Sequence, residues 1–202
     1  MAQLRVADPV LRAVIDQVDV DALDPAGARP PQDHYGALVR SIVGQQLSTK
    51  AARAIYTRLT DRFGGRTPTP QEVLADDPEA LRAAAGLSRA KVGFLRSLAE
   101  HVVEGSLELV RLEQLSDHEV IAELVAVKGI GTWSAHMFLM FQLQRPDVLA
   151  VGDLGIRRAV MIQYGLPALP RSAQLEQIAE PWRPHRTLAC RFLWRSLDAT
   201  PI

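Results

Sequence analysis

The chain has 202 residues, of which 48% are hydrophobic and 23% are charged, a composition typical of a soluble globular protein with one sizeable core. Its 23 basic residues balance its 23 acidic residues, which argues against a protein that coats nucleic acid through a strongly basic surface. The single cysteine, Cys190, excludes an internal disulfide and an iron–sulfur cluster held by four cysteines.

Helical spacing of apolar residues, together with N-capping residues, predicts a chain that is almost wholly helical. The expected longer helices cover residues 9–18, 33–43, 49–63, 88–103, 116–125, 132–144, 154–164, 173–180 and 184–196. Two shorter helices should open at Thr69-Pro70 and Asp77-Pro78, because a capping residue followed by proline is typical of a helix start. Residues 19–32 form an expected loop. No stretch alternates as a strand should, although residues 147–151 are a short apolar run that suits extended backbone.

The residues Lys128, Gly129, Ile130, Gly131 and Thr132 join two of these helices. The two glycines permit backbone torsions that side chains would forbid, and they leave amide groups open to close approach. The helix that follows points its N-terminal N–H groups and its positive dipole end at this turn. The arrangement suits a phosphate oxygen, so we predict that these residues form an anion-binding hairpin.

Asp153 follows Gly152 and directly precedes the helix expected from residue 154. A carboxylate in that position can simply cap the helix. It can also present a negative charge to a ligand at a turn flanked by glycines. The residues alone leave both interpretations open.

Further motifs occur in a fixed order along the chain. They are residues 41–52 (Ser-Ile-Val-Gly-Gln-Gln-Leu-Ser-Thr-Lys-Ala-Ala), residues 86–91 (Gly-Leu-Ser-Arg-Ala-Lys) and residues 181–184 (Pro-Trp-Arg-Pro), the last followed by Trp194. Together with the hairpin and Asp153, they make the chain from about residue 35 to residue 197 resemble the helix-hairpin-helix DNA glycosylases. Within that superfamily it is similar to the DNA-3-methyladenine glycosylase II branch.

The resemblance implies an all-α, two-lobed helix-hairpin-helix DNA glycosylase fold that lacks the N-terminal β-domain of the best-known branch members. Residues 1–202 would then form one helical glycosylase domain. The outer lobe is expected over about residues 35–134, and residues 1–34 and 135–202 would form the other lobe.

The implied function is base excision repair of DNA that carries alkylation damage. The enzyme would flip alkylated purines out of duplex DNA and hydrolyse the N-glycosidic bond, leaving an abasic site. Asp153 would be catalytic, because a carboxylate stabilises the positive charge that develops on the sugar. One carboxylate can suffice, since an alkylated purine is already cationic and leaves readily. The alternatives are a non-catalytic DNA-binding module that uses only the hairpin, and a glycosylase for oxidised or mismatched bases.

Two tryptophans match aromatic residues of the branch's base pocket, Trp133 and Trp194. An indole face attracts a cationic base by about 0.5–2 kcal/mol. Members of the superfamily that also cut the strand carry a lysine where Trp133 stands, and that lysine forms a Schiff base with the sugar. An indole cannot do so, and the resemblance therefore implies a monofunctional hydrolase. The alternative for both tryptophans is packing in the core.

The resemblance also places a wedge at Gln46 and Leu47, where a side chain would fill the gap left by the flipped nucleotide. Capping of the next helix by the glutamine amides is the structural alternative. The backbone carbonyls of Val125, Val127 and Ile130 match positions that hold a monovalent cation in the family.

No further cofactor is expected, and the histidines lack the spacing of transition-metal ligands. The expected partner is double-stranded DNA containing alkylated bases, bound by a monomer. We expect no association with a membrane, because no apolar run is long enough to cross a bilayer and the first residues lack the apolar core of a signal peptide. A cytoplasmic, nucleoid-associated location follows from these expectations.

Overall fold

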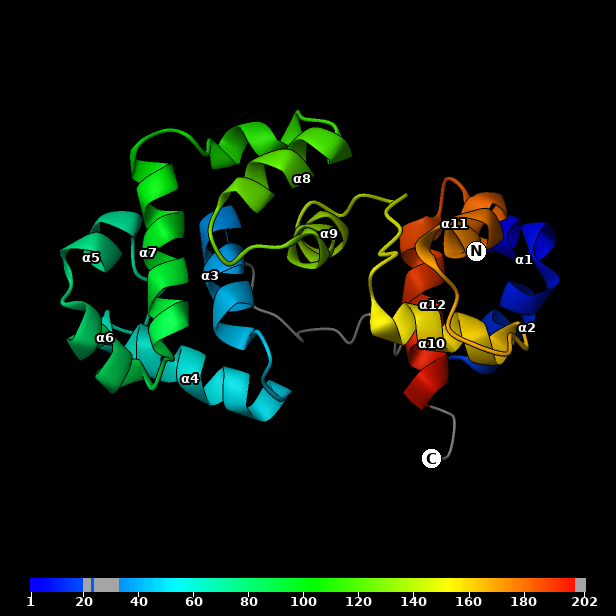
Figure 1. Ribbon diagram of the computed structural model, residues 1–202, viewed down its shortest axis with the longest axis horizontal. Helices are drawn as coiled ribbons and strands as arrows, with labels where there is room; N and C mark the ends of the chain where they lie inside the picture. The colour runs from blue at the N-terminus through cyan, green and yellow to red at the C-terminus, as the bar shows by residue number, and fades with distance from the viewer. Residues whose placement is uncertain (20–22, 24–32, 199–202) are drawn as a thin grey trace. The chain divides into compact units, whose positions relative to one another are not determined.

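The computed structural model describes residues 1–19, 23 and 33–198 (Figure 1). Within these residues it is helical and contains no strand, so the expected all-α class is confirmed. The α-helices are α1 (Ala2–Ala7), α2 (Pro9–Gln17), α3 (His34–Gly44), α4 (Thr49–Arg62), α5 (Pro70–Ala75), α6 (Pro78–Ala85), α7 (Arg89–Val103), α8 (Asp117–Ala126), α9 (Thr132–Phe141), α10 (Leu154–Gln163), α11 (Ser172–Ala179) and α12 (Arg186–Asp198). Two 3-10 helices, η2 (Leu109–Glu113) and η3 (Glu180–Trp182), complete the order.

Most helix starts were predicted correctly, because a capping residue precedes most of the helices. Asp33, Ser48, Asp77, Ser88 and Ser116 each accept a backbone N–H from the first turn of the helix that follows. Each such side chain satisfies a donor that has no partner inside the helix. Capping chemistry is local, and for this reason it can be predicted from sequence.

Several expectations need correction. Helix α1 and the 3-10 helix η2 were not predicted, because short helices carry little periodic signal. Helix α9 ends at Phe141 and not at Gln144, because Gln144 has a φ of 53° and the Arg145 amide donates to the Leu139 carbonyl (2.9 Å). Residues 147–151 form no strand. The expected loop over residues 19–32 lies, apart from residues 19 and 23, outside the described residues.

The chain divides into two compact units, one comprising residues 1–30 and 139–202 and the other residues 31–138. In the 31–138 unit, α3 packs on α4 and α7, and α7 in turn packs on α5 and α6 (Figure 1). Apolar side chains fill the space between these helices, among them Leu38, Ile42, Leu95 and Leu98, each at most 1% exposed. Burial of this apolar surface is the main favourable contribution to the folding of the unit.

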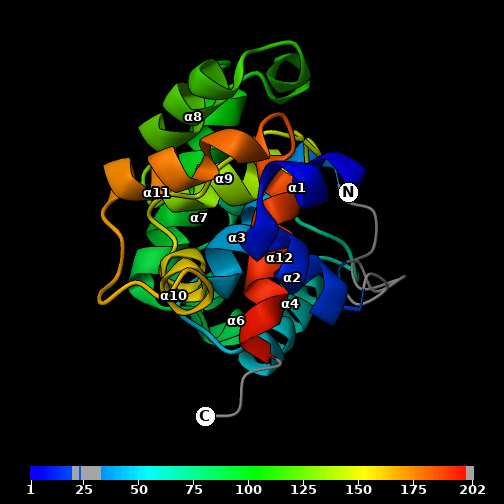
Figure 2. The same ribbon diagram turned by 90° about the vertical axis from the view of Figure 1, so that its right-hand side faces the viewer.

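In the other unit, α12 packs on α10 and α2, and α1 lies beside α2 (Figure 2). Phe192 and Leu193 of α12 are fully buried, as are Leu11 of α2 and Val160 of α10. Helix α12 therefore lies at the centre of this unit. Trp194 directly follows the buried Phe192 and Leu193 and is itself part-buried.

The buried carboxylate of Asp8 links the N-terminal part of this unit to its C-terminal part. Asp8 is 6% exposed and caps α2, its Oδ1 accepting the amides of Val10 (2.9 Å) and Leu11 (3.0 Å). Its Oδ2 accepts the indole N–H of Trp182 (2.8 Å) and the hydroxyl of Tyr164. Burial, followed by the bond to Asp8, raises the pKa of the Tyr164 hydroxyl. Trp182 is fully buried, so it packs in the core of this unit.

Two further observations bear on the predictions made from composition. Cys190 is fully buried, and burial raises the pKa of its thiol to about 12, which leaves the thiol protonated and inert. None of the helices in residues 1–19 and 33–198 is long and apolar enough to span a membrane.

Replacement of Asp8 by alanine should destabilise the protein by about 3–5 kcal/mol. The variant loses the cap of α2 and leaves the buried indole N–H of Trp182 and the part-buried hydroxyl of Tyr164 without this acceptor. The matched control is Asp16→Ala, because Asp16 is half exposed and pairs with Arg5 at the surface (2.8 Å). That variant should lose less than about 1 kcal/mol. Urea unfolding followed by circular dichroism measures both, and equal losses would contradict the role given to Asp8.

Candidate functional site

The predicted hairpin joins α8 to α9. Helix α8 ends at Ala126, and the Ile130 amide donates to the Val127 carbonyl (3.1 Å) to close the turn. Ile130 points inward and is 4% exposed, whereas Lys128, Gly131 and Thr132 are exposed. The buried side chains of Val127 and Ile130 thus anchor the turn, while Lys128, Gly131 and Thr132 face solvent.

The two glycines of the hairpin serve different purposes. Gly129 has a φ of 91°, and a Cβ built on it would lie 2.2 Å from the ring of Phe94. Only glycine fits there, because both the torsion and the space exclude a side chain. A Cβ on Gly131 would meet nothing within 4 Å. Gly131 is thus required neither by its torsion nor by packing, but it keeps the outer side of the turn bare.

Helix α9 begins directly after this bare surface. Its first turn exposes Thr132 and Trp133, and the Trp133 side chain is 48% exposed. The first N–H groups of a helix have no intrahelical acceptor and carry the positive end of its dipole. His136, one turn on, is part-buried, and this burial lowers its pKa despite the nearby charge of Asp117. The lowered pKa favours the neutral form of His136 at pH 7, so this histidine adds little to the positive potential of the backbone N–H groups at the start of α9.

A second turn, Gln45–Gln46–Leu47, follows α3 and is bonded to the hairpin. The side-chain amide of Gln45 donates to the carbonyl of Gly129 (2.8 Å). Gln46 adopts a left-handed conformation (φ 59°), which costs a residue with a side chain roughly 1 kcal/mol. Its side chain is exposed, as is that of Leu47 (38%). The structure therefore brings the predicted wedge residues to the hairpin, as two exposed side chains on a strained turn.

Lys91 fixes this turn from the other side. Its ammonium group donates to the carbonyls of Val43 (2.7 Å) and Gln45 (2.8 Å), where α3 ends. A cation is favourable at a helix C-terminus, because it meets carbonyls that have no intrahelical partner. Burial lowers the pKa of Lys91. The motif at residues 86–91 was noticed in the sequence, but its role was not predicted, because the carbonyls that it serves lie 46 and 48 residues earlier.

Helix α7 also supports the hairpin directly. Phe94 lies under Gly129, and the Ser97 hydroxyl accepts the amide of Lys128 (3.3 Å). Neither residue was predicted to belong to the site. Their spacing to Lys91, three and six residues along one helix, places all three on neighbouring parts of its surface. That spacing is the one signal in the sequence that could have identified them.

Asp153 caps α10 and is buried, with 8% of its surface exposed. Its Oδ1 accepts the Ile156 amide (2.7 Å) and the indole N–H of Trp194 (2.9 Å). The capping interpretation is therefore correct as far as it goes. The other interpretation, a carboxylate that presents its charge to a ligand, stays open, because the same bonds hold the carboxylate in one orientation.

The segment that leads to Asp153 is fixed to the start of α12. Arg186 donates through Nε to Oδ1 of Asp147 (2.8 Å) and through Nη2 to the Asp147 carbonyl (2.7 Å). The Val148 amide donates to the Thr187 hydroxyl (3.0 Å). The bond to Thr187 gives the amide of the buried Val148 a partner without a strand.

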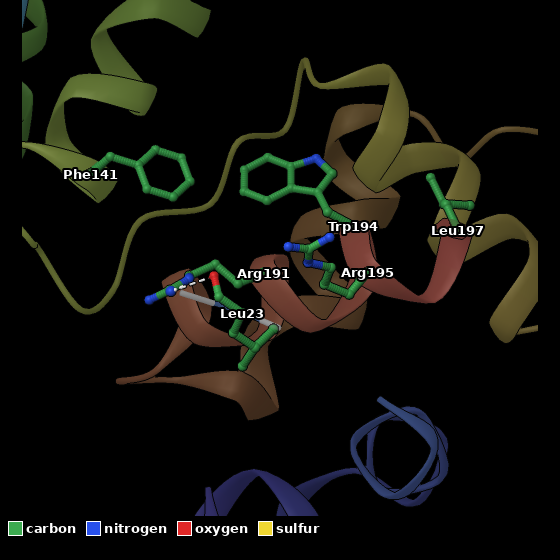
Figure 3. Close-up of a pocket in the computed structure, with 6 residues that line it drawn as sticks. All are labelled: Leu23, Phe141, Arg191, Trp194, Arg195 and Leu197. Atoms are coloured by element: carbon green, nitrogen blue, oxygen red, sulfur yellow. Dashed lines mark hydrogen bonds between the residues drawn. The ribbon is translucent and has the colours of Figure 1, made fainter. Parts of the chain in front are cut away.

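Trp194 borders a cavity of about 420 Å³ in the same unit (Figure 3). Its ring stacks against Phe141, with the centroids 6.0 Å apart and the planes at 26°. The indole nitrogen lies on the side away from Phe141. The residues lining the cavity are Leu23, Phe141, Arg191, Trp194, Arg195 and Leu197. Phe141 and the two arginines were not predicted, although residues 191 and 195 share a helix face with residue 194.

The structure thus groups the predicted site residues into two sets. Asp153 and Trp194 are bonded to each other in the unit of residues 1–30 and 139–202. The hairpin, the Gln45–Leu47 turn and Trp133 belong to the unit of residues 31–138. The assignment of Trp133 to a base pocket remains a prediction.

The carbonyls of Val125, Val127 and Ile130 were expected to hold a monovalent cation. Val125 lies in the last turn of α8, where carbonyl oxygens have no intrahelical N–H donor. Main-chain carbonyl oxygens are suitable ligands for a hard cation. The Val127 carbonyl already accepts the Ile130 amide (3.1 Å) and would share its remaining lone pair. No three histidine, cysteine or carboxylate side chains of the described residues gather in a way that could bind a metal ion.

Comparisons with known proteins agree with this geometry. The family model of the HhH-GPD superfamily base excision DNA repair proteins matches residues 39–184. DNA-3-methyladenine glycosylase 1 of Schizosaccharomyces pombe is 36% identical over 167 residues, which cover 82% of this chain and 73% of that protein.

Two solved structures have similar folds. The 3-methyladenine DNA glycosylase Mag1 of Schizosaccharomyces pombe, in complex with abasic DNA, superposes with a TM-score of 0.85 at 33% identity, covering 98% of this chain and 95% of that one. A DNA-3-methyladenine glycosidase of Bacillus halodurans gives a TM-score of 0.81 at 37% identity, covering 96% and 87%. The resemblance inferred from the motifs is confirmed, and the chain belongs to the HhH-GPD superfamily of base excision DNA repair proteins.

Proposed function

We propose that the protein is a monofunctional DNA-3-methyladenine glycosylase, which releases alkylated purines from duplex DNA and leaves an abasic site. The observation that carries the proposal is the buried carboxylate of Asp153, held on one oxygen by a helix N–H and an indole N–H. The names of the relatives support the same substrate class, and the Mag1 structure with abasic DNA supports DNA as the partner.

Asp153 would act on the charge that develops as the N-glycosidic bond breaks. The sugar becomes positively charged, and a fixed carboxylate nearby lowers the energy of that state without reorganising. The same group can orient or deprotonate the attacking water. An alkylated purine departs as a neutral base, so the leaving group needs no second carboxylic acid.

The hairpin would grip the DNA backbone. The amides at the bare surface around Gly131 and the first turn of α9 suit a phosphate oxygen, and exposed Lys128 adds a positive charge. A monovalent cation on the carbonyls of Val125, Val127 and Ile130 would bridge the hairpin to the same strand. The exposed Gln46 and Leu47 would fill the space that the flipped nucleotide leaves.

The cavity beside Trp194 offers the extruded base an aromatic surface. The rings of Trp194 and Phe141 favour a cationic base through their faces. Arg191 and Arg195 also line the cavity, and their positive charge opposes such a base. Any preference for cationic lesions must then come from the rings, from weakened pairing in the duplex and from the ease of departure.

The direct test is to incubate the protein with methylated duplex DNA and to identify the released bases by mass spectrometry. The wild type should release methylated purines. Asp153→Asn should lose base release by about 10²-fold or more, because the charge that the transition state uses is gone. Its affinity for the duplex should stay close to that of the wild type, since the hairpin is untouched.

Thermal unfolding of the Asn variant is the control for its fold. Turnover close to wild type in this variant would leave Asp153 with a capping role only. DNA binding without base release by the wild type would favour the non-catalytic binding module.

The reaction should produce abasic sites without strand breaks. Trp133 has no amine with which to form a Schiff base with the sugar. Borohydride added during turnover should therefore trap no covalent protein–DNA product on a denaturing gel, whereas alkali added afterwards should cut the strand at each abasic site. A borohydride-trapped product would overturn the monofunctional assignment.

Replacement of Gly131 by valine should weaken binding to damaged and undamaged duplexes by a similar factor. The new side chain would stand on the bare outer surface of the hairpin, where a phosphate would approach, and phosphate contacts carry no base information. The control is Gly93→Val on the exposed face of α7, where a Cβ likewise meets nothing within 4 Å. Fluorescence anisotropy at two salt concentrations measures both variants. Normal affinity of Gly131→Val for plain duplex would exclude the hairpin as the DNA anchor.

A further inference from the structure

We infer that Trp194 is a positioning residue, whose indole N–H orients the carboxylate of Asp153, and that Gly155 is the residue that makes room for this bond. The inference rests on the proposed function, because it concerns how the carboxylate is presented to the reacting sugar. It gives Trp194 a role that is separable from its ring face.

Two donors from different elements converge on one oxygen of Asp153. The Ile156 amide belongs to α10, the helix that Asp153 caps, and the Trp194 indole belongs to α12. The terminal torsion of an aspartate is broad, so a single bond to its own helix leaves the plane of the carboxylate poorly defined. The second donor fixes that plane. Bonds to a charged acceptor are also stronger than those between neutral groups.

Gly155 explains how the indole reaches the carboxylate. A Cβ built on Gly155 would lie 3.0 Å from Oδ1 of Asp153, 3.1 Å from Cδ1 of Trp194 and 3.2 Å from its Nε1. It would contact both partners of the hydrogen bond at once. Helical positions ordinarily favour alanine over glycine, because glycine loses more backbone entropy in a helix. The glycine at this helical position is therefore explained by the space that the bond requires.

Trp194 is held so that its N–H points in one direction only. Its neighbours Phe192 and Leu193 are fully buried and lock α12 into the unit. Phe141 stacks on the ring of Trp194, on the side away from the indole nitrogen (Figure 3). Trp194 thus lines the cavity while its N–H is bonded to Asp153.

The two roles of Trp194 predict different results. If the ring acts by stacking on the base, its loss should change the preference between a cationic and a neutral lesion. If the N–H acts by orienting Asp153, its loss should slow the release of both lesions by the same factor, because the sugar and the carboxylate are common to both reactions.

The experiment compares Trp194→Phe, Gly155→Ala and the control Gly152→Ala. Phenylalanine keeps a ring but has no N–H. Alanine at residue 155 keeps every functional group but disturbs the bond, and it suits a helix better than glycine does. Gly152 stands on the other side of Asp153, where a Cβ would meet nothing within 4 Å.

Single-turnover release of 7-methylguanine and of hypoxanthine is measured with enzyme in saturating excess over DNA. Trp194→Phe and Gly155→Ala should slow both reactions by about 10-fold or more, with an unchanged ratio of the two rates and duplex affinity within about twofold of the wild type. Gly152→Ala should match the wild type. A changed ratio in Trp194→Phe with a normal rate in Gly155→Ala would overturn the inference and leave Trp194 as a stacking residue.

A second measurement does not depend on activity. The chain has three tryptophans, so three indole N–H signals can be followed by hydrogen exchange in an ¹⁵N spectrum. The Trp194 signal should be protected in the wild type and lose that protection in Asp153→Ala, while the Trp182 signal, held by Asp8, stays protected. Unchanged protection of Trp194 would overturn the inference even in an active enzyme. Failure of the wild type to release any base would instead overturn the proposed function.

Discussion

A carboxylate with 8% of its surface exposed needs hydrogen-bond donors, and the unit that contains Asp153 is organised around supplying them. One donor is the first turn of α10, which requires Asp153 to stand at the helix cap. The other is an indole on α12, which requires that helix to pack closely on α10. Four hydrogen bonds between Arg186 and Asp147 then hold the loop before Asp153 to the start of α12. Helix packing, loop and cap all converge on the position of one charge.

The unit of residues 31–138 is organised around backbone groups instead. Lys91 donates hydrogen bonds to carbonyls at the end of α3, and the Gln45 side chain donates to the hairpin carbonyl of Gly129. The hairpin and the strained turn at Gln46 are thus parts of one bonded assembly on α7. Strain in a residue such as Gln46 persists only where its surroundings fix it, and it is typical of functional sites. Movement of the turn would have to break bonds that also hold the hairpin.

Much of the fold could be predicted because its information is local. Capping residues such as Asp33 and Ser48 mark helix starts, and periodic apolar residues mark buried faces. Asp153, Trp194 and the hairpin were found through the spacing of motifs. Phe94, Phe141 and Gly155 were missed, because each matters only through a neighbour that is distant in the sequence or through space left empty. Glycine required by a neighbouring side chain has no local signature that differs from glycine required by a turn.

Asp8 and Asp153 show what local sequence does not reveal about a residue's hydrogen-bond partners. Both aspartates cap a helix, and both accept an indole N–H from the C-terminal part of the chain. Sequence cannot separate them, because aspartate before a helix is common to both. Oδ1 of Asp8 accepts amides of its own helix, and its Oδ2 accepts the donors of Trp182 and Tyr164. Oδ1 of Asp153 accepts both a helix amide and the indole N–H of Trp194. The two donors of Asp153 come from different helices, the amide from α10 and the indole from α12. Capping by an aspartate can be predicted from the residues around it, but the indole that bonds to Asp153 lies 41 residues later, and only the packing of α12 brings it there.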